Sequence, residues 1–220
     1  SSNYRTYGLT DDNWSQYNGY YAIRNAKELY GFAQLFNTLP TQAVTSKSVL
    51  GVVANAVLLS DIVINTSVDP ASNPYSWTPI GMDGTNRKMF AGVFDGNGYS
   101  ISGVYQNYTD TKAQYSGLFA SLGCATVKNL VVKNSTFYAG IYGGSVVTRY
   151  INASTIEGIR IEDSVTLFAA GNSNGFAELE YVYGAYDYAP LAKNVYVGTK
   201  VIGGAENLTG IIAYEINSSS

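Results

Sequence analysis

One short pattern recurs through this chain: an apolar residue, any residue, then Asn, Asp or Gly, followed by apolar, any residue and apolar. Successive side chains of a strand point to opposite faces, so the two-residue step keeps both apolar residues inside. The three-residue step crosses a bend, where Gly and Asn tolerate the positive φ of a sharp turn. The pattern predicts strands that bend and stack in coils. It occupies residues 59–64, 127–132, 156–161 and 192–197, and residues 101–106 match except at the last place.

A second pattern runs beside the first and supports the same interpretation. Counted from Val104, successive copies of the first pattern lie 26, 29 and 36 residues apart. Successive copies of the second pattern lie 27, 31 and 35 residues apart. Two patterns that lengthen together indicate coils with loops of variable length. At the usual strand spacing of ~4.8 Å, we expect about five to seven such coils. The second pattern is Gly117-Leu118-Phe119, Gly144-Ser145-Val146, Gly175-Phe176-Ala177 and Gly210-Ile211-Ile212.

Several of these motifs resemble the GLUG-type right-handed β-helix domains of bacterial surface proteins. The resemblance covers residues 21–213, and its motifs are architectural, so it implies a fold more strongly than a function. It implies a module of an adhesin-like cell-surface protein. The motifs are Asp61-Ile62, Trp77-x-Pro79-Ile80-Gly81, Phe94-Asp95-Gly96-Asn97-Gly98-Tyr99-x-Ile101, Gly117-Leu118-Phe119 and Val127-x-Asn129-Leu130-x-Val132.

One helix is predicted, over residues 23–37. Asn25 can cap it, and Glu28 three residues later completes a capping-box signature. Leu29, Phe32, Ala33 and Phe36 then fall on one face. A solenoid exposes strand edges and core at its first coil, and an amphipathic helix there would cover them. We therefore expect an irregular segment over residues 1–22, or an edge segment laid along the first coil, followed by the capping helix, coils over residues 38–217 and a tail over residues 218–220.

The composition excludes several classes of protein. Charged residues make up 13% of the chain and the net charge is −3, without a basic cluster, which argues against nucleic-acid binding. No apolar run approaches the 18 or more residues of a membrane span. The polar surface must be mainly Ser, Thr, Asn, Gln and Tyr, which is typical of extracellular binding proteins. The only cysteine, Cys124, lies between Leu122 and Val127 and is predicted to be a small buried residue.

Familiar catalytic and metal sites are also excluded by the residue inventory. The chain has no histidine and one cysteine, so neither a Ser-His-Asp system nor a His- or Cys-ligated zinc site can form. Asp95-Gly96-Asn97-Gly98 begins like a calcium loop, but Tyr99 stands at a ligand position and the closing Glu is missing. We interpret it as a turn, and we expect no metal and no cofactor.

Acidic residues leave one enzymatic alternative open, because some β-helix proteins cleave polysaccharides. Such chemistry needs two carboxylates at a fixed separation in a cleft. The ordinary interpretation is that these residues are solvated and lie at turns. The candidates are Glu157, Glu162, Asp163, Glu178 and Glu180.

Tyrosine is the compositional anomaly, with 20 among 220 residues. Tyrosine suits β-structure and can stack in ladders along a solenoid. An exposed tyrosine can also stack on a sugar ring and donate a hydrogen bond. Both interpretations stay open for one cluster in the longest interval between the two patterns. This predicted ligand-binding cluster is Tyr181, Tyr183, Tyr186 and Tyr188.

The sequence therefore predicts an all-β, right-handed parallel β-helix with one N-terminal capping helix. The expected function is that of a non-catalytic, extracellular module of a larger bacterial surface protein, serving adhesion or ligand binding, with carbohydrate as one candidate ligand. Its partners would be a glycan or host-surface ligand and neighbouring domains, without nucleic acid or membrane insertion. The alternatives are a polysaccharide lyase or hydrolase on this fold and a structural spacer.

Overall fold

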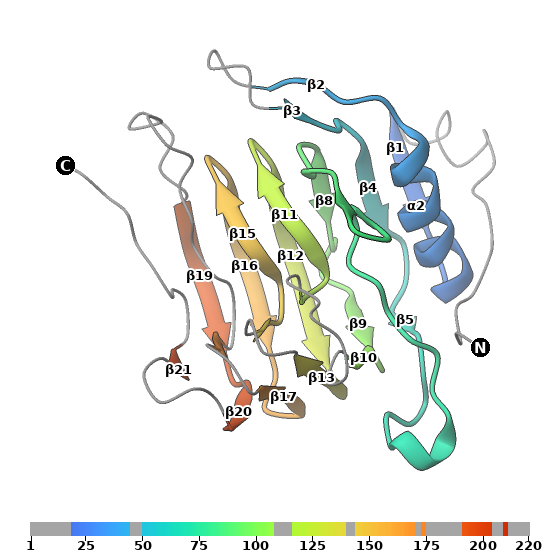
Figure 1. Ribbon diagram of the computed structural model, residues 1–220, viewed down its shortest axis with the longest axis vertical. Helices are drawn as coiled ribbons and strands as arrows, with labels where there is room; N and C mark the ends of the chain where they lie inside the picture. The colour runs from blue at the N-terminus through green and yellow to red at the C-terminus, as the bar shows by residue number, and fades with distance from the viewer. Residues whose placement is uncertain are drawn as a thin grey trace.

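The chain winds into a parallel β-solenoid. The computed structural model describes residues 19–44, 50–107, 116–139, 144–169, 173–174, 191–203 and 209–210. Strands of successive coils stack side by side from the N-terminal helix to the last coil (Figure 1). This confirms the predicted right-handed β-helix with an N-terminal helix, in about four turns. The longest sheet stacks six strands along this axis, in the order β1, β4, β8, β12, β16 and β19.

The longest side of the coil, which we name wall 1, contains a strand from every layer. All of its neighbouring strands pair in parallel. Its strands are β1 (Tyr20–Ile23), β4 (Asn55–Leu58), β5 (Ile62–Val63), β8 (Val93–Asp95), β9 (Ser100–Ser102), β12 (Thr126–Lys133), β16 (Thr155–Ile161) and β19 (Leu191–Val197).

The second side, wall 2, is a four-stranded parallel sheet, and the third side holds two short parallel sheets. Wall 2 consists of β10 (Tyr105–Asn107), β13 (Ser135–Ala139), β17 (Val165–Ala169) and β20 (Lys200–Gly203). The third side consists of β11 (Phe119–Gly123) with β15 (Thr148–Asn152), and of β14 (Gly144–Ser145) with β18 (Ser173–Asn174) and β21 (Thr209–Gly210).

Three of the predicted repeats align in wall 1 as the sequence indicates. Leu130 pairs with Ile159, and Ile159 pairs with Val195, so these side chains form one row along the stack. Leu130 and Ile159 are each 1% exposed, because the row runs through the core. The predicted parallel stacking of residues 127–132, 156–161 and 192–197 is therefore confirmed.

The corner beside this row is held by backbone in the left-handed region. Asn129, Gly158 and Asn194 occupy equivalent positions and have φ of 55°, 64° and 53°. Only Gly, and less often Asn, adopts this conformation without a large steric cost. A Cβ added to Gly158 would lie 2.9 Å from the Asn129 side-chain oxygen of the coil before. Residue type at this corner is thus set by backbone shape and close stacking.

The earlier members of the first pattern follow a different register from the predicted one. Phe94 pairs with Val127, and Ile101 pairs with Val132. The step of seven residues from Phe94 to Ile101 is therefore matched by a step of five residues in the next coil. The extra two residues form a turn in which Tyr99 N–H donates to Gly96 O at 2.8 Å. The predicted alignment of residues 101–106 is therefore wrong, as is that of residues 59–64, since Ile62 pairs with Ile101.

The second predicted pattern is also displaced. Phe119 pairs with Thr148, two residues beyond the predicted partner Val146, and Gly144 pairs with Ser173 and not with Gly175. The coil step here is 29 residues, from 119 to 148, which equals the step of wall 1 from Leu130 to Ile159. The Gly-apolar pairs are common enough in this chain to align by chance. Residues 175–177 lie outside the described part of the chain.

The first coil begins earlier than predicted. Of the two interpretations of the N-terminal segment, the edge segment is correct for Tyr20–Ile23, which forms β1. Its backbone pairs in parallel with β4, and Ala22 and Ile23 are buried. The helix α2 consequently runs over Ala26–Thr38 and not over residues 23–37.

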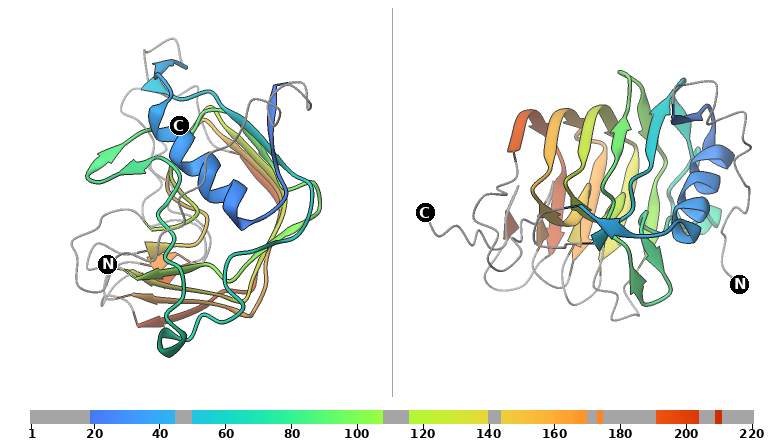
Figure 2. Two further views of the ribbon diagram at one scale, coloured as in Figure 1. Left: turned by 90° about the vertical axis from the view of Figure 1, so that its right-hand side faces the viewer. Right: turned by 90° about the horizontal axis from the view of Figure 1, so that it is seen from above.

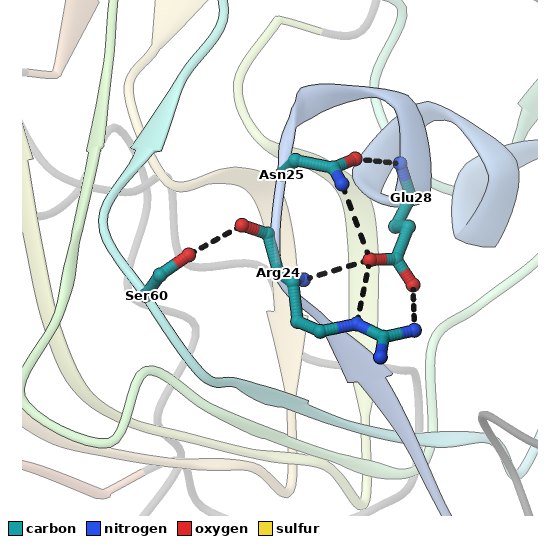
Figure 3. Close-up of polar contacts among 4 residues, drawn as sticks. All are labelled: Arg24, Asn25, Glu28 and Ser60. Atoms are coloured by element: carbon teal, nitrogen blue, oxygen red, sulfur yellow. Dashed lines mark hydrogen bonds and ion pairs between the residues drawn. The ribbon is translucent and has the colours of Figure 1, made fainter.

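The predicted N-cap of α2 is confirmed, with a change in how the glutamate is used. Asn25 Oδ1 accepts the Glu28 N–H at 3.0 Å (Figure 3). The Glu28 carboxylate accepts the backbone N–H of Arg24 at 3.3 Å, one residue before the cap, and two hydrogen bonds from the Arg24 guanidinium at 2.9 and 3.0 Å. Ser60 donates to Arg24 O and so ties the helix entry to the next layer.

Helix α2 closes the N-terminal end of the core. Figure 2 (left) shows it lying across the end of the coils. Leu29, Phe32 and Phe36 are at most 1% exposed, as predicted. The Phe32 ring lies 6.4 Å from the ring of Phe90, and Phe36 stacks on Phe90 at 5.6 Å. The helix is therefore packed against aromatic residues of the coils.

The C-terminal end of α2 is fixed by an antiparallel hairpin, β6 (Met82–Asp83) and β7 (Asn86–Arg87), which interrupts the third side of an early coil. Lys88 Nζ donates to Asn37 O at 2.6 Å and to Leu39 O at 3.0 Å. A cation is favourable at a helix C-terminus, where carbonyls lack partners. Directly after α2, and before this hairpin in the sequence, the chain returns to wall 1 through β2 (Gln42–Ala43) and β3 (Leu50–Gly51). These two strands pair with each other.

Truncating Phe32 tests whether α2 is an integral cap. We expect Phe32→Ala to lower the free energy of unfolding by about 3–5 kcal/mol, because a fully buried aromatic ring is lost. The exposed control Lys27→Ala should change it by about 0.5 kcal/mol or less. Urea denaturation followed by circular dichroism measures both, and a Phe32→Ala cost below roughly 1 kcal/mol would show that the helix is a loose appendage.

The exposed corner residue Asn129 tests the backbone account. Asn129→Val should cost about 1–2 kcal/mol, because a β-branched residue is forced into the left-handed region. Asn129→Gly and the neighbouring strand control Lys128→Val should each stay within about 0.5 kcal/mol of the parent. Equal stabilities for the valine and glycine variants at position 129, in the same denaturation assay, would contradict this account.

Candidate functional site

The four tyrosines predicted to bind ligand, Tyr181, Tyr183, Tyr186 and Tyr188, lie outside the described residues. The strands on either side of them are described: β18 ends at Asn174 and β19 begins at Leu191. Residues 175–190 therefore join these two strands with 16 residues, whereas residues 146–154 join β14 to β16 with nine. The tyrosine cluster thus belongs to a connection seven residues longer than the equivalent one in the preceding coil.

Connections that leave the solenoid are held at their bases by polar side chains. Asn65 Oδ1 accepts the Tyr75 N–H at 2.8 Å, and Asn65 Nδ2 donates to Tyr75 O at 2.9 Å. The same Nδ2 donates to Gly103 O at 2.9 Å in the following coil. One side chain therefore closes the loop of residues 66–74, which carries the short helix η1 (Pro70–Ser72), and anchors it to wall 1.

A buried glutamine, Gln106, fixes the base of a second connection. Gln106 is 1% exposed, and its Nε2 donates to Trp77 O at 3.2 Å and to Gly117 O at 3.4 Å. Gly117 N–H donates to Gln106 Oε1 at 3.0 Å. The chain leaves wall 2 after Asn107 and is described again from Ser116, so this network joins the two ends of that connection. A buried and satisfied polar network of this kind rigidifies its surroundings.

Aromatic residues form a ladder on the outer face of wall 2. Tyr138 pairs in register with Phe168, and their rings are stacked 4.8 Å apart with an 8° angle between planes. Tyr105 lies edge-on to Tyr138 at 6.1 Å. Because Tyr138 and Phe168 cover each other's faces, those faces cannot stack on a sugar. For these described aromatics the ladder interpretation is the correct one.

The outer face of wall 1 carries alternating charges and one half-exposed ring. Asp95, Lys128, Glu157 and Lys193 lie in register on successive strands. Lys193 Nζ lies 3.6 Å from Glu157 Oε1. In the adjacent row the Arg160 guanidinium lies 4.2 Å from the centre of the Tyr196 ring, which is 50% exposed.

The carboxylates considered for polysaccharide cleavage are engaged in surface contacts. Glu157 pairs with Lys193, and Glu162 Oε1 lies 3.9 Å from Arg160 Nε. The turn that contains Asp163 is closed by the Val165 N–H, which donates to Glu162 O at 3.1 Å. The ordinary interpretation, solvated residues at a strand and a turn, describes these three. Glu178 and Glu180 lie outside the described residues.

The segment that resembles a calcium loop is a tight turn. Asn97 N–H donates to Asp95 Oδ1 at 2.8 Å, and Asn97 and Gly98 have φ of 53° and 82°. Positive φ at both central positions is the pattern of a type I′ turn, which Asn-Gly strongly prefers. In the part of the chain that is described, no three acidic or cysteine side chains gather closely enough to hold a metal ion.

Cys124 is not a core residue as predicted, but a partly exposed corner residue. Its φ is 54°, and Ala153 takes the equivalent position in the next coil with φ of 51°. The corner between the third side and wall 1 turns the side chain away from the core. Partial burial still raises the pKa of the Cys124 thiol.

The residue pairs that organise the outer faces were missed by sequence reasoning. Tyr138 follows Val132 by six residues, whereas Phe168 follows Ile161 by seven, so the wall 2 ladder has no constant spacing from the wall 1 repeat. The Arg160–Tyr196 and Glu157–Lys193 pairs could have been found, since both lie inside the correctly aligned repeats.

Comparisons with known proteins give no relative from which a role could be inferred: no family model, curated protein or solved structure matches the chain. The resemblance to GLUG-type domains therefore stays a prediction. In the described residues, no helix is long and apolar enough to cross a membrane.

Asp61 has a structural role in this framework. Its Oδ1 accepts the Ser100 N–H at 2.9 Å and the Ser100 hydroxyl at 3.1 Å, across the β5–β9 pair. These hydrogen bonds, with a smaller contribution from Lys133, hold the pKa of Asp61 below its ordinary value of 3.8. A carboxylate bound in this way stabilises the fold more when it is ionised than when it is protonated.

This contact predicts a specific pH dependence. The folded pKa lies below the unfolded one, so the stabilisation is complete above the unfolded pKa and is lost as the pH falls through the folded value. Asp61→Asn can still accept from Ser100 but does not titrate. We expect any stability advantage of the parent, less than about 1 kcal/mol at an exposed site, to shrink from pH 5 to pH 2 in urea denaturation. Parallel stability curves for the two proteins would contradict the assignment.

Proposed function

We propose that this chain is a non-catalytic, extracellular module of a larger bacterial surface protein and that it serves adhesion or ligand binding. The observation that carries the proposal is the arrangement of anchored connections on a solenoid with a continuous core. Asn65 and Gln106 fix loop bases to the stacked strands, and one core cluster runs through the described coils. Binding residues are often carried by loops on a rigid scaffold of this kind.

The tyrosine cluster is the best candidate for the binding surface. It lies in the long connection between β18 and β19, and these two strands are held in their sheets by the neighbouring coils. Tyrosine supplies a large contact area at low entropic cost and a hydroxyl for hydrogen bonding. These properties fit a glycan or another ligand on a host or cell surface. The resemblance to GLUG-type domains is the reason to assign the module to adhesion and to the cell surface.

A structural spacer is the second candidate, and the wall 2 ladder favours it. Stacked rings such as Tyr138 and Phe168 stabilise neighbouring coils, and the two faces in contact are closed to a ligand. A stiff rod of this kind could hold another domain away from the cell. Binding assays separate the two functions, because a spacer needs no ligand.

Replacing Tyr183 and Tyr186 together with Ala tests the binding function. If each ring stacks on a ligand, the loss should be on the order of 1 kcal/mol per ring, and glycan affinity should fall about tenfold or more. A glycan array with mucin and plant polysaccharides first identifies a ligand, and calorimetry then measures its affinity for both proteins.

The control is Tyr75→Ala, which removes an exposed tyrosine from another loop and should leave the affinity unchanged. The melting temperature of the double variant should also stay near that of the parent. An early-melting double variant would show that these rings are core residues. A chain that binds nothing on the array would favour the spacer.

A further inference from the structure

The two ends of the solenoid differ in how their cores are covered. At the N-terminal end, helix α2 buries the first coils. In the last described coil, Val195, Val197 and Val201 are only partly buried, whereas their register partners Ile159, Ile161 and Leu167 are at most 1% exposed. In the view from above in Figure 2 (right), the layers run from α2 at one end to β19 at the other.

Within the described part of the chain, the backbone of β19 is paired along one side only. β19 pairs with β16, and no other described strand pairs with it. In a parallel sheet, the N–H and C=O groups of a strand point alternately to its two neighbours, so an edge strand offers half of them to a new strand. The side chains at this edge are open as well, since Leu191 is 51% exposed and Tyr196 is 50% exposed.

The existing contact with β16 shows which strand chemistry suits β19. Glu157 lies beside Lys193, Ile159 lies beside Val195 and Ile161 lies beside Val197. The Lys193–Glu157 ion pair is at 3.6 Å, and both side chains are more than one third exposed. Lys193 is thus accessible to solvent, and it continues a row in which acidic and basic residues alternate. An acidic residue is the complementary neighbour at the next position.

We propose that the open edge of β19 accepts an extended strand from a partner protein in parallel register. That strand would place an acidic residue beside Lys193 and aliphatic residues beside Val195 and Val197. Strand addition of this kind draws affinity from backbone hydrogen bonds and specificity from alternate side chains. This interaction surface goes beyond the proposed ligand binding and does not use the tyrosine cluster.

The strand β16 supplies a probe of known register. A capped peptide, Thr-Ile-Glu-Gly-Ile-Arg-Ile, copies residues 155–161 and should bind the open edge when added to the ¹⁵N-labelled full chain. We expect saturable amide shift changes in β19. A control peptide with Lys in place of Glu should bind about tenfold more weakly, since like charges directly opposite on neighbouring strands are destabilising.

The variant Lys193→Glu should reverse this preference, binding the lysine peptide more tightly than the glutamate peptide. The reversal separates strand addition from unfolding, because both peptides are compared on one folded variant. Three results would overturn the proposal: no shift change in β19, the same preference in both proteins, or β19 shifts that depend on protein concentration without peptide. The last result would identify a second copy of this chain as the occupant. Glycan affinity measured with peptide bound reports separately on the proposed ligand binding.

Discussion

The left-handed corner in wall 1 is the constraint on which the rest of the fold depends. At Asn129, Gly158 and Asn194 the backbone takes positive φ at the same place in three coils. Each corner turns the strand by the same amount, so the apolar residues before and after it return to the core. Rows such as Leu130, Ile159 and Val195 exist because this turn repeats. The outer pairs, Glu157 with Lys193 and Arg160 with Tyr196, are set by the same register.

The two ends of a stack of coils would expose core side chains and unpaired strand edges unless something covers them. At the N-terminal end the cover belongs to the same chain: α2 comes shortly after β1 and packs Phe32 and Phe36 against the Phe90 ring of the coils. Asn25 accepts one backbone N–H at the start of that helix, and Lys88 donates to two carbonyls at its end. On the side of β19 that faces away from β16, the described residues form neither a helix nor a strand. This asymmetry makes the two ends chemically distinct, one sealed by apolar packing and one carrying an accessible lysine and backbone edge.

How much the sequence could predict depends on whether a feature repeats at constant spacing. Three wall 1 strands and the capping helix were predictable, because apolar periodicity and a capping residue define them locally. The Gly96–Tyr99 turn adds two residues to one coil, so the predicted alignments of residues 59–64 and 101–106 fail. The third side was misaligned by two residues because Gly-apolar pairs are frequent. Cys124 was misplaced, since nothing local marks it as a left-handed corner. The predicted tyrosine cluster lies outside the described residues, and its role stays a prediction.

Methyl–methyl NOE spectroscopy on the folded chain tests the stacked register most directly. The account predicts strong cross-peaks between Leu130 and Ile159 and between Ile159 and Val195. It predicts none between Leu130 and Val195, which are two strand spacings, about 10 Å, apart. It also predicts that Val127 contacts Ile156 and that Val132 contacts Ile161. Cross-peaks from Val127 to Ile161 in place of these would show an antiparallel pair and would contradict the solenoid.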